Sequence, residues 1–157
     1  KKDFNIEGIL TDGHSTYFFN RGNGPAGVNG VYKVAGKLND LKGKKIDFFS
    51  IELPQLNNEM TTFSDAILVD GKVLFIATVE FKSTTQYNGE IKGSIIGEMN
   101  LKTMKVTRWK QISADRKVEG LALYKQSRRK YTLYLCEDND DDSKKANIFV
   151  YKYELED

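Results

Sequence analysis

The sequence predicts an all-β protein built from repeated antiparallel units. Helical periodicity is almost absent, and short runs of β-branched and aromatic residues alternate with turns rich in Gly, Asn, Asp and Lys. The same arrangement of paired strands also returns three times along the chain. These observations favour one β domain over residues 1–157, with eleven strands in groups of four, four and three.

Three strand pairs form the basis of this prediction. Two of them are joined by an Asp-Gly step, which favours a tight hairpin because Gly tolerates the positive φ that such a turn needs. A polar segment of Lys, Gln, Ser and Arg joins the third pair. The pairs are Asn5–Thr11 with Ser15–Asn20, Phe63–Val69 with Lys72–Thr78, and Val118–Tyr124 with Tyr131–Glu137.

Further strands follow each pair after a polar loop. The first two groups receive two more strands each, whereas the last group receives one. These strands are predicted at Gly30–Val34, Ile46–Leu53, Ile95–Asn100, Lys105–Ile112 and Asn147–Leu155.

The three groups also share an acidic residue near the start of the first strand. These residues are Glu7, Asp65 and Glu119, which are 58 and 54 residues apart. A unit of four antiparallel strands that recurs about every 50 residues is typical of a β-propeller blade. The blades are predicted at residues 4–60, 61–114 and 115–157, the last without its outer strand.

Three blades are too few for a closed ring, because propellers usually have roughly four to eight. The sequence therefore predicts half of a six-bladed propeller. The other blades are expected either from a missing N-terminal half or from a second copy of this chain.

Composition narrows the classes of function. The net charge is +2 and the basic residues are scattered among acidic ones, so neither a nucleic acid nor a membrane is expected as a partner. The chain has one Cys and one His, which disfavours zinc sites and Ser/His or Cys/His nucleophile systems. Aromatic residues at alternate strand positions are expected to pack between blades, and Trp109 is expected to be partly exposed on an outer strand.

The stretch GNGPAG at residues 22–27 matches the dinucleotide-binding pattern G-x-G-x-x-G. That pattern works only where a strand turns directly into a helix whose N-terminus holds a pyrophosphate. Here Pro25 and then the strand-like NGVYKV follow, with no helical run. The match is interpreted as chance in a Gly-rich loop between strands.

The leading candidates for a site are Glu7, Asp65 and Glu119. The first strand of each propeller blade lines the central channel, so equivalent positions would form a ring around its axis. Converging carboxylates raise one another's proton affinity unless a cation joins them. Oxygen ligands without His or Cys suit Ca²⁺ or Mg²⁺ as the metal. The alternative is a structural role, in which each carboxylate accepts hydrogen bonds from nearby backbone N–H groups.

The ends of the second strands supply a further set of candidates, Asn20, Arg21 and Glu137. Because the second strands run opposite to the first, this set is expected at the other end of the channel, away from the acidic residues. Arg21 could bind an anionic group through two parallel hydrogen bonds. Alternatively it pairs with an acidic neighbour such as Glu137.

The segment EDNDDDS imitates the opening of a calcium-binding loop through Asp138, Asp140 and Asp142. Ser143 stands where the loop requires Gly, and Phe149 stands where it requires Glu, so an EF-hand is excluded. A solvated acidic loop is favoured, with a loosely held surface cation as the alternative.

Several segments resemble the strand pairs of phytase-like bacterial β-propellers. They read NIEGILTDGHSTYFFNRGN, FSDAILVDGKVLFIATVE and VEGLALYKQSRRKYTLYLCEDND. The likeness is to an uncharacterised family found in Bacteroidetes in which an N-I-E-G…N-R-G-N segment falls near mid-chain, and it implies that this chain is the C-terminal half. Glu7-Gly8 also resembles six-bladed lactonase propellers, in which an acidic residue opening an inner strand ligates a divalent metal. Ile9 stands where those proteins have Pro.

Three functions are compatible with these observations. The first is a propeller module that binds a ligand or partner in its channel or on one face. The second is a divalent-metal-dependent hydrolase of phosphoesters or lactones, in which the metal polarises the attacking water. The third is a purely structural half that assembles with a complementary chain through exposed strand edges.

Overall fold

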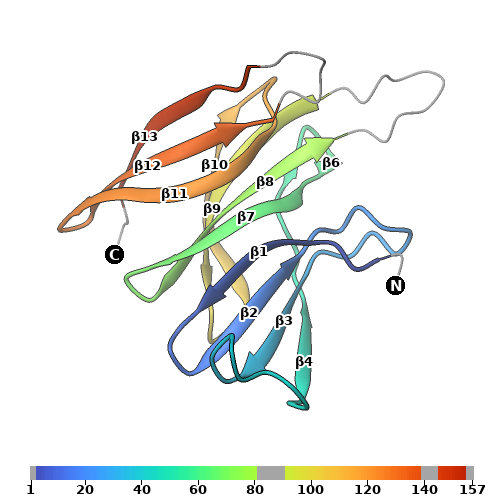
Figure 1. The fold of residues 1–157 in the computed structure, drawn as a ribbon. Helices are drawn as coiled ribbons and strands as arrows, with labels where there is room; N and C mark the ends of the chain where they lie inside the picture. Colours follow the sequence, from blue (N-terminus) through green and yellow to red (C-terminus); the bar gives the residue numbers. More distant parts are fainter. Residues whose placement is uncertain (1–2, 81–90, 139–144, 155–157) are drawn as a thin grey trace.

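The computed structural model describes residues 3–80, 91–138 and 145–154, and in these residues the protein is all-β with no helix (Figure 1). Three antiparallel sheets follow one another along the chain, and each is a meander of consecutive strands. We call them the first, middle and third sheets. The first sheet contains β1 (Ile6–Thr11), β2 (Ser15–Asn20), β3 (Gly30–Ala35) and β4 (Ile46–Ser50). The middle sheet contains β7 (Thr62–Val69), β8 (Lys72–Glu80), β9 (Ile91–Asn100) and β10 (Lys105–Ser113). The third sheet contains β11 (Val118–Ser127), β12 (Lys130–Glu137) and β13 (Ile148–Glu154).

The eleven predicted strands are therefore all present, with boundaries that shift by a few residues. The predicted Asp-Gly hairpins are also confirmed. Gly13 has φ 90°, and both Asp70 (φ 49°) and Gly71 (φ 76°) lie in the left-handed region that a tight hairpin turn requires. A short hairpin of β5 (Gln55–Leu56) and β6 (Glu59–Met60) between the first and middle sheets was not predicted.

The sheets stack face to face, with the middle sheet between the other two (Figure 1). One core cluster joins the first and middle sheets, and Phe63 is its centre because its ring makes edge contacts with both Phe19 and Phe75. A second cluster joins the middle and third sheets. It contains Leu74, Ile76, Ile96, Leu121, Leu133 and Leu135.

The first strands of the three sheets, β1, β7 and β11, lie next to one another (Figure 1). Each of them contains a β-bulge near its start, where the pairing with the second strand shifts by one residue. Such bulges bend a strand and redirect one side chain. The bulges therefore mark equivalent positions in the three sheets, and they lie where the three first strands converge.

The loop that carries GNGPAG connects β2 to β3, so the prediction that no helix follows it is confirmed. The loop instead contacts the middle sheet through Asn29. The Asn29 side chain accepts hydrogen bonds from the backbone N–H groups of Gly22 and Phe63 and donates one to the carbonyl of Thr61. A Cβ at Gly22 would lie 2.6 Å from the backbone nitrogen of Asn29, so this close approach of the two backbone segments requires glycine.

Within the described residues, no helix is long and apolar enough to cross a membrane.

Candidate functional site

The candidate site is an ionic cluster at the point where β1, β7 and β11 begin. Its centre is Arg21, which directly follows β2 and is 5% exposed. Arg21 Nη1 lies 3.5 Å from Glu7 Oε1 and 3.3 Å from Glu119 Oε1. One guanidinium group thus joins an acidic residue of the first sheet to an acidic residue of the third.

This arrangement corrects the prediction that Arg21 and the acidic residues lie at opposite ends of the channel. In an antiparallel pair, the end of the second strand lies beside the start of the first. The register accordingly pairs Ile6 with Asn20, which brings Arg21 next to Glu7. The alternative, in which Arg21 pairs with an acidic neighbour, describes the arrangement, but the neighbours are Glu7 and Glu119 and the partners of Glu137 are others. Glu137 accepts two hydrogen bonds of 2.9 Å from Arg116 and one of 2.7 Å from Asn147.

A second buried cation, Lys117, completes the cluster. Its Nζ lies 2.9 Å from Glu119 Oε1 and 3.9 Å from Asp138 Oδ2. Arg21 also donates a hydrogen bond from Nε to Thr62 Oγ1 at 3.2 Å, which holds the guanidinium against the start of β7. The two cations are therefore buried beneath the carboxylates, whereas the side chains of Glu7 and Glu119 each remain 27% exposed.

The structure changes the role of Asp65. The bulge residues are Glu7 in β1, Ser64 in β7 and Glu119 in β11, so Asp65 occupies the position of Gly8 and Gly120. Its Oδ1 accepts a hydrogen bond from the N–H of Ala66, and its Oδ2 accepts one from the N–H of Leu121. Asp65 thus links the middle and third sheets, as the structural alternative predicted for these carboxylates.

The bulge residue of the middle sheet, Ser64, belongs to a buried hydroxyl network. Ser64 Oγ donates to Thr78 Oγ1, which lies 2.9 Å from Ser94 Oγ. Ser94 in turn accepts a hydrogen bond from the N–H of Val118. The network ties the middle sheet to the start of β11, directly behind Glu119.

Burial raises the pKa of two of these carboxyl groups, Asp65 and Glu119. Burial raises the pKa of Asp65 and the nearby charge of Glu7 adds to this effect, while the two backbone hydrogen bonds oppose it. Burial also raises the pKa of Glu119. A hydrogen bond with Asp138 acts in the same direction, and Lys117 and Arg21 oppose it. Burial thus disfavours the charged form of both groups, whereas the backbone N–H groups at Asp65 and the two cations at Glu119 favour it.

Asn20, another predicted site residue, is buried and serves the backbone. Its Oδ1 accepts a hydrogen bond from the N–H of Asn5, and its Nδ2 donates to the carbonyl of Asp3. The Asn5 side chain in turn donates to Glu7 Oε1 at 2.9 Å. Asn20 therefore positions the segment that carries Glu7.

The predicted metal sets have different outcomes. Among the residues that the structure describes, no group of three His, Cys, Asp or Glu side chains is arranged to hold a metal ion. Glu7 and Glu119 share Arg21, and Asp65 faces backbone N–H groups. In the acidic loop, Asp138 is exposed, whereas Asp140 and Asp142 lie outside the described residues.

Sequence reasoning missed Lys117 and Thr62, which have no counterparts in a recognised motif. A signal for Lys117 does exist, because it stands two residues before Glu119 in the third unit. This short separation of opposite charges could have suggested the pairing in advance.

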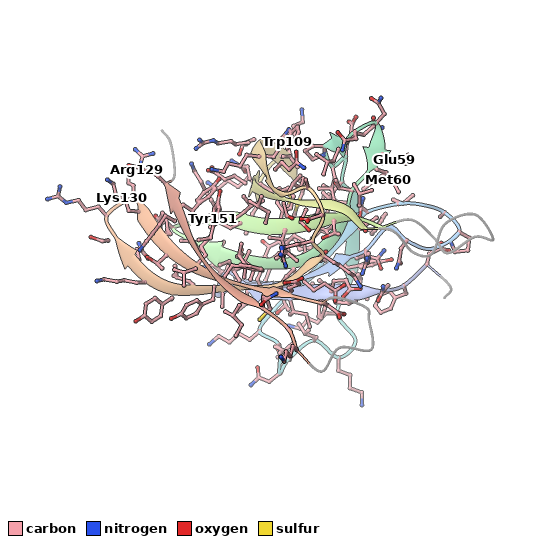
Figure 2. The ribbon with its side chains drawn as sticks, turned by 90° about the horizontal axis from the view of Figure 1, so that it is seen from above. Glu59, Met60, Trp109, Arg129, Lys130 and Tyr151 are labelled. Atoms are coloured by element: carbon pink, nitrogen blue, oxygen red, sulfur yellow. The ribbon has the colours of Figure 1, made fainter. Side chains whose placement is uncertain are left out.

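A separate pocket of about 690 Å³ lies between the outer strands of the first and middle sheets. Val28, Met60 and Trp109 line it together with the segment 50–55. Trp109 is 43% exposed, which confirms the prediction for this residue, and it lies on the same side of the molecule as Met60 (Figure 2).

Comparison with known proteins assigns a family to the chain. The model of a family of unknown function, DUF6929, matches residues 1–153. The chain belongs to this family. No curated protein and no solved structure matches the chain. The DUF6929 description gives no activity, so the phytase-like and lactonase resemblances stay predictions.

Proposed function

We propose that this DUF6929 chain is a binding module with β-propeller architecture, and that the cluster around Arg21 binds a cationic group of a ligand or partner. The propeller arrangement is supported by three meander sheets stacked in chain order, with their first strands side by side. In a propeller these strands line the channel, so the cluster would face it.

The observation that carries the proposal is the division of charge by depth. Glu7 and Glu119 expose part of their side chains, and Asp138 is half exposed, whereas Arg21 and Lys117 are each 5% exposed. A group approaching from solvent therefore meets carboxylate oxygens first. Those oxygens bind amino and guanidinium groups through charge-assisted hydrogen bonds.

The geometry favours this module over the metal-dependent hydrolase. Glu7 and Glu119 already share a guanidinium group, and Lys117 contacts the same oxygen of Glu119. A divalent cation bound by both carboxylates would lie close to those two positive charges, which costs free energy. A monovalent organic cation needs fewer oxygens and is accommodated at the exposed side.

Titrations followed by ¹H–¹⁵N NMR test the proposal, with argininamide, CaCl₂ and inorganic phosphate as separate probes. We expect argininamide to shift the amide signals of Gly8 and Gly120, which neighbour the two glutamates, and phosphate to leave them unchanged. The double substitution Glu7→Gln and Glu119→Gln should abolish the shifts. Glu52→Gln, at an exposed site outside the cluster, is the matched control.

Two results would overturn the proposal: no response to argininamide, or an equal response in the double variant. Shifts with CaCl₂ but not argininamide would instead favour the hydrolase.

A further inference from the structure

The middle sheet is buried on both faces, one by the first sheet and the other by the third sheet. The register aligns Ala66, Phe75, Gly97 and Trp109 in one row across its four strands. In this row Ala66 and Phe75 belong to the core shared with the first sheet. The neighbouring row on the opposite face contains Ile76 and Ile96, which belong to the core shared with the third sheet.

The outer face of the first sheet has an apolar row that belongs to neither of the two core clusters of the described residues. Ile9, Phe18, Tyr32 and Phe48 are aligned across β1 to β4. Ile9 is 51% exposed and Phe48 is 48% exposed. The aromatic rings of Tyr32 and Phe48 lie 4.8 Å apart, so they form one continuous surface.

The bulges show which row of the middle sheet corresponds to this one. Ile9 follows its bulge at the same distance as Ala66 follows the bulge of β7. The row of Ile9 is therefore the counterpart of the row of Ala66, which packs against the preceding sheet. By this correspondence, the face of the first sheet that carries Ile9 is the face on which another sheet, earlier in the ring, would pack.

The outer face of the third sheet is exposed in the same way. Tyr134 and Val150 are aligned across β12 and β13, and Cys136 and Ile148 form the next row. Ile148 is 67% exposed and Val150 is 61% exposed. By the same bulge alignment, Cys136 and Ile148 correspond to Phe19 and Val31 of the first sheet, which are fully buried against the middle sheet.

The two exposed faces are thus of opposite kinds. One corresponds to faces that pack on a preceding sheet, and the other to faces that pack on a following sheet. These two kinds already meet twice inside the chain, at the two core clusters. A second copy of the chain supplies both kinds at once, and two copies together have six large sheets, which lies within the usual range of a closed propeller.

We propose that two copies of this chain assemble head to tail. The third-sheet face of each copy, with Tyr134, Ile148 and Val150, packs on the first-sheet face of the other, with Ile9, Tyr32 and Phe48. This inference rests on the propeller architecture in the proposed function and extends it. In the assembly the two Arg21 clusters would face one channel.

Light scattering after gel filtration tests the assembly. We expect the wild-type chain to have about twice its mass of 17.9 kDa. Val150→Lys places a charge in the interface and should reduce the mass to that of one chain. Leu38→Lys is the matched control, because Leu38 is 60% exposed and lies in the β3–β4 loop, and it should keep the doubled mass.

Circular dichroism establishes that each variant is folded, and Phe48→Lys on the first sheet replaces Val150→Lys if the latter unfolds. A wild-type chain that stays monomeric at all accessible concentrations would overturn the proposal, and so would a folded Val150→Lys chain that keeps the doubled mass. A monomer whose amides still respond to argininamide would overturn the assembly alone and leave the binding function standing.

Discussion

The middle sheet and the two end sheets are all antiparallel meanders with a bulge near the start of the first strand, yet they differ in how far other residues bury them. Val73, Phe75, Ile76 and Ile96 of the middle sheet are fully buried, on two different faces. The first and third sheets bury one face each, and the other face carries apolar side chains that are about half exposed or more, such as Phe48 and Val150. Contiguous exposed apolar patches on a soluble protein mark interaction sites. The exposed outer faces of the first and third sheets therefore correspond to faces that are buried between sheets elsewhere in the chain.

The largest expected effect separates the two kinds of face. Phe75→Ala removes a ring that is fully buried in the middle sheet, so we expect the free energy of unfolding to fall by about 3–5 kcal/mol. Phe48→Ala removes a ring that is half exposed, and we expect a loss below about 1 kcal/mol. Urea unfolding measures both, in the Val150→Lys background so that assembly does not contribute. Equal losses would contradict the difference between middle and end sheets.

A smaller effect concerns pH and a position where the middle sheet differs from its neighbours. Asp65 stands where the end sheets have Gly8 and Gly120, and burial raises its pKa above the ordinary value of 3.8. The folded state therefore binds a proton more tightly than the unfolded state. By linkage, the stability that depends on this proton is present below pH 3.8 and is lost as the pH rises through the raised pKa.

We therefore expect the wild type to lose stability relative to Asp65→Asn as the pH increases from about 3.8. The loss should be below about 1 kcal/mol, because the carboxyl group remains partly solvated. Urea unfolding at a series of pH values measures it, with the exposed Glu52→Gln as the control. An Asp65→Asn curve parallel to the wild-type curve would show that this carboxyl does not titrate differently in the folded state.

Most of the fold could be predicted because its signals are local. The Asp-Gly steps and the alternation of apolar and polar residues mark each strand without any knowledge of its neighbours. The hairpin of β5 and β6 was missed because strands of two residues have no periodicity to detect.

The site was harder to predict because it depends on register and packing between sheets. Sequence spacing aligned Asp65 with the two glutamates, whereas the bulges of the three first strands align Ser64 with them. Glu7 and Glu119 lie in one ionic cluster. Their shared partner Arg21 was predicted at the opposite end of the channel. That prediction considered the direction of β2 but not its antiparallel pairing, which places the end of β2 beside the start of β1.

The most direct test of the correspondence between end faces is a mixing experiment. Phe48→Lys disrupts the first-sheet face and Val150→Lys disrupts the third-sheet face, so each variant alone should be monomeric. In a mixed dimer, the intact third-sheet face of the Phe48→Lys chain meets the intact first-sheet face of the Val150→Lys chain. Light scattering on the mixture should then show a mass near twice 17.9 kDa. A mixture that stays monomeric while the wild type is dimeric would contradict head-to-tail packing of these two faces.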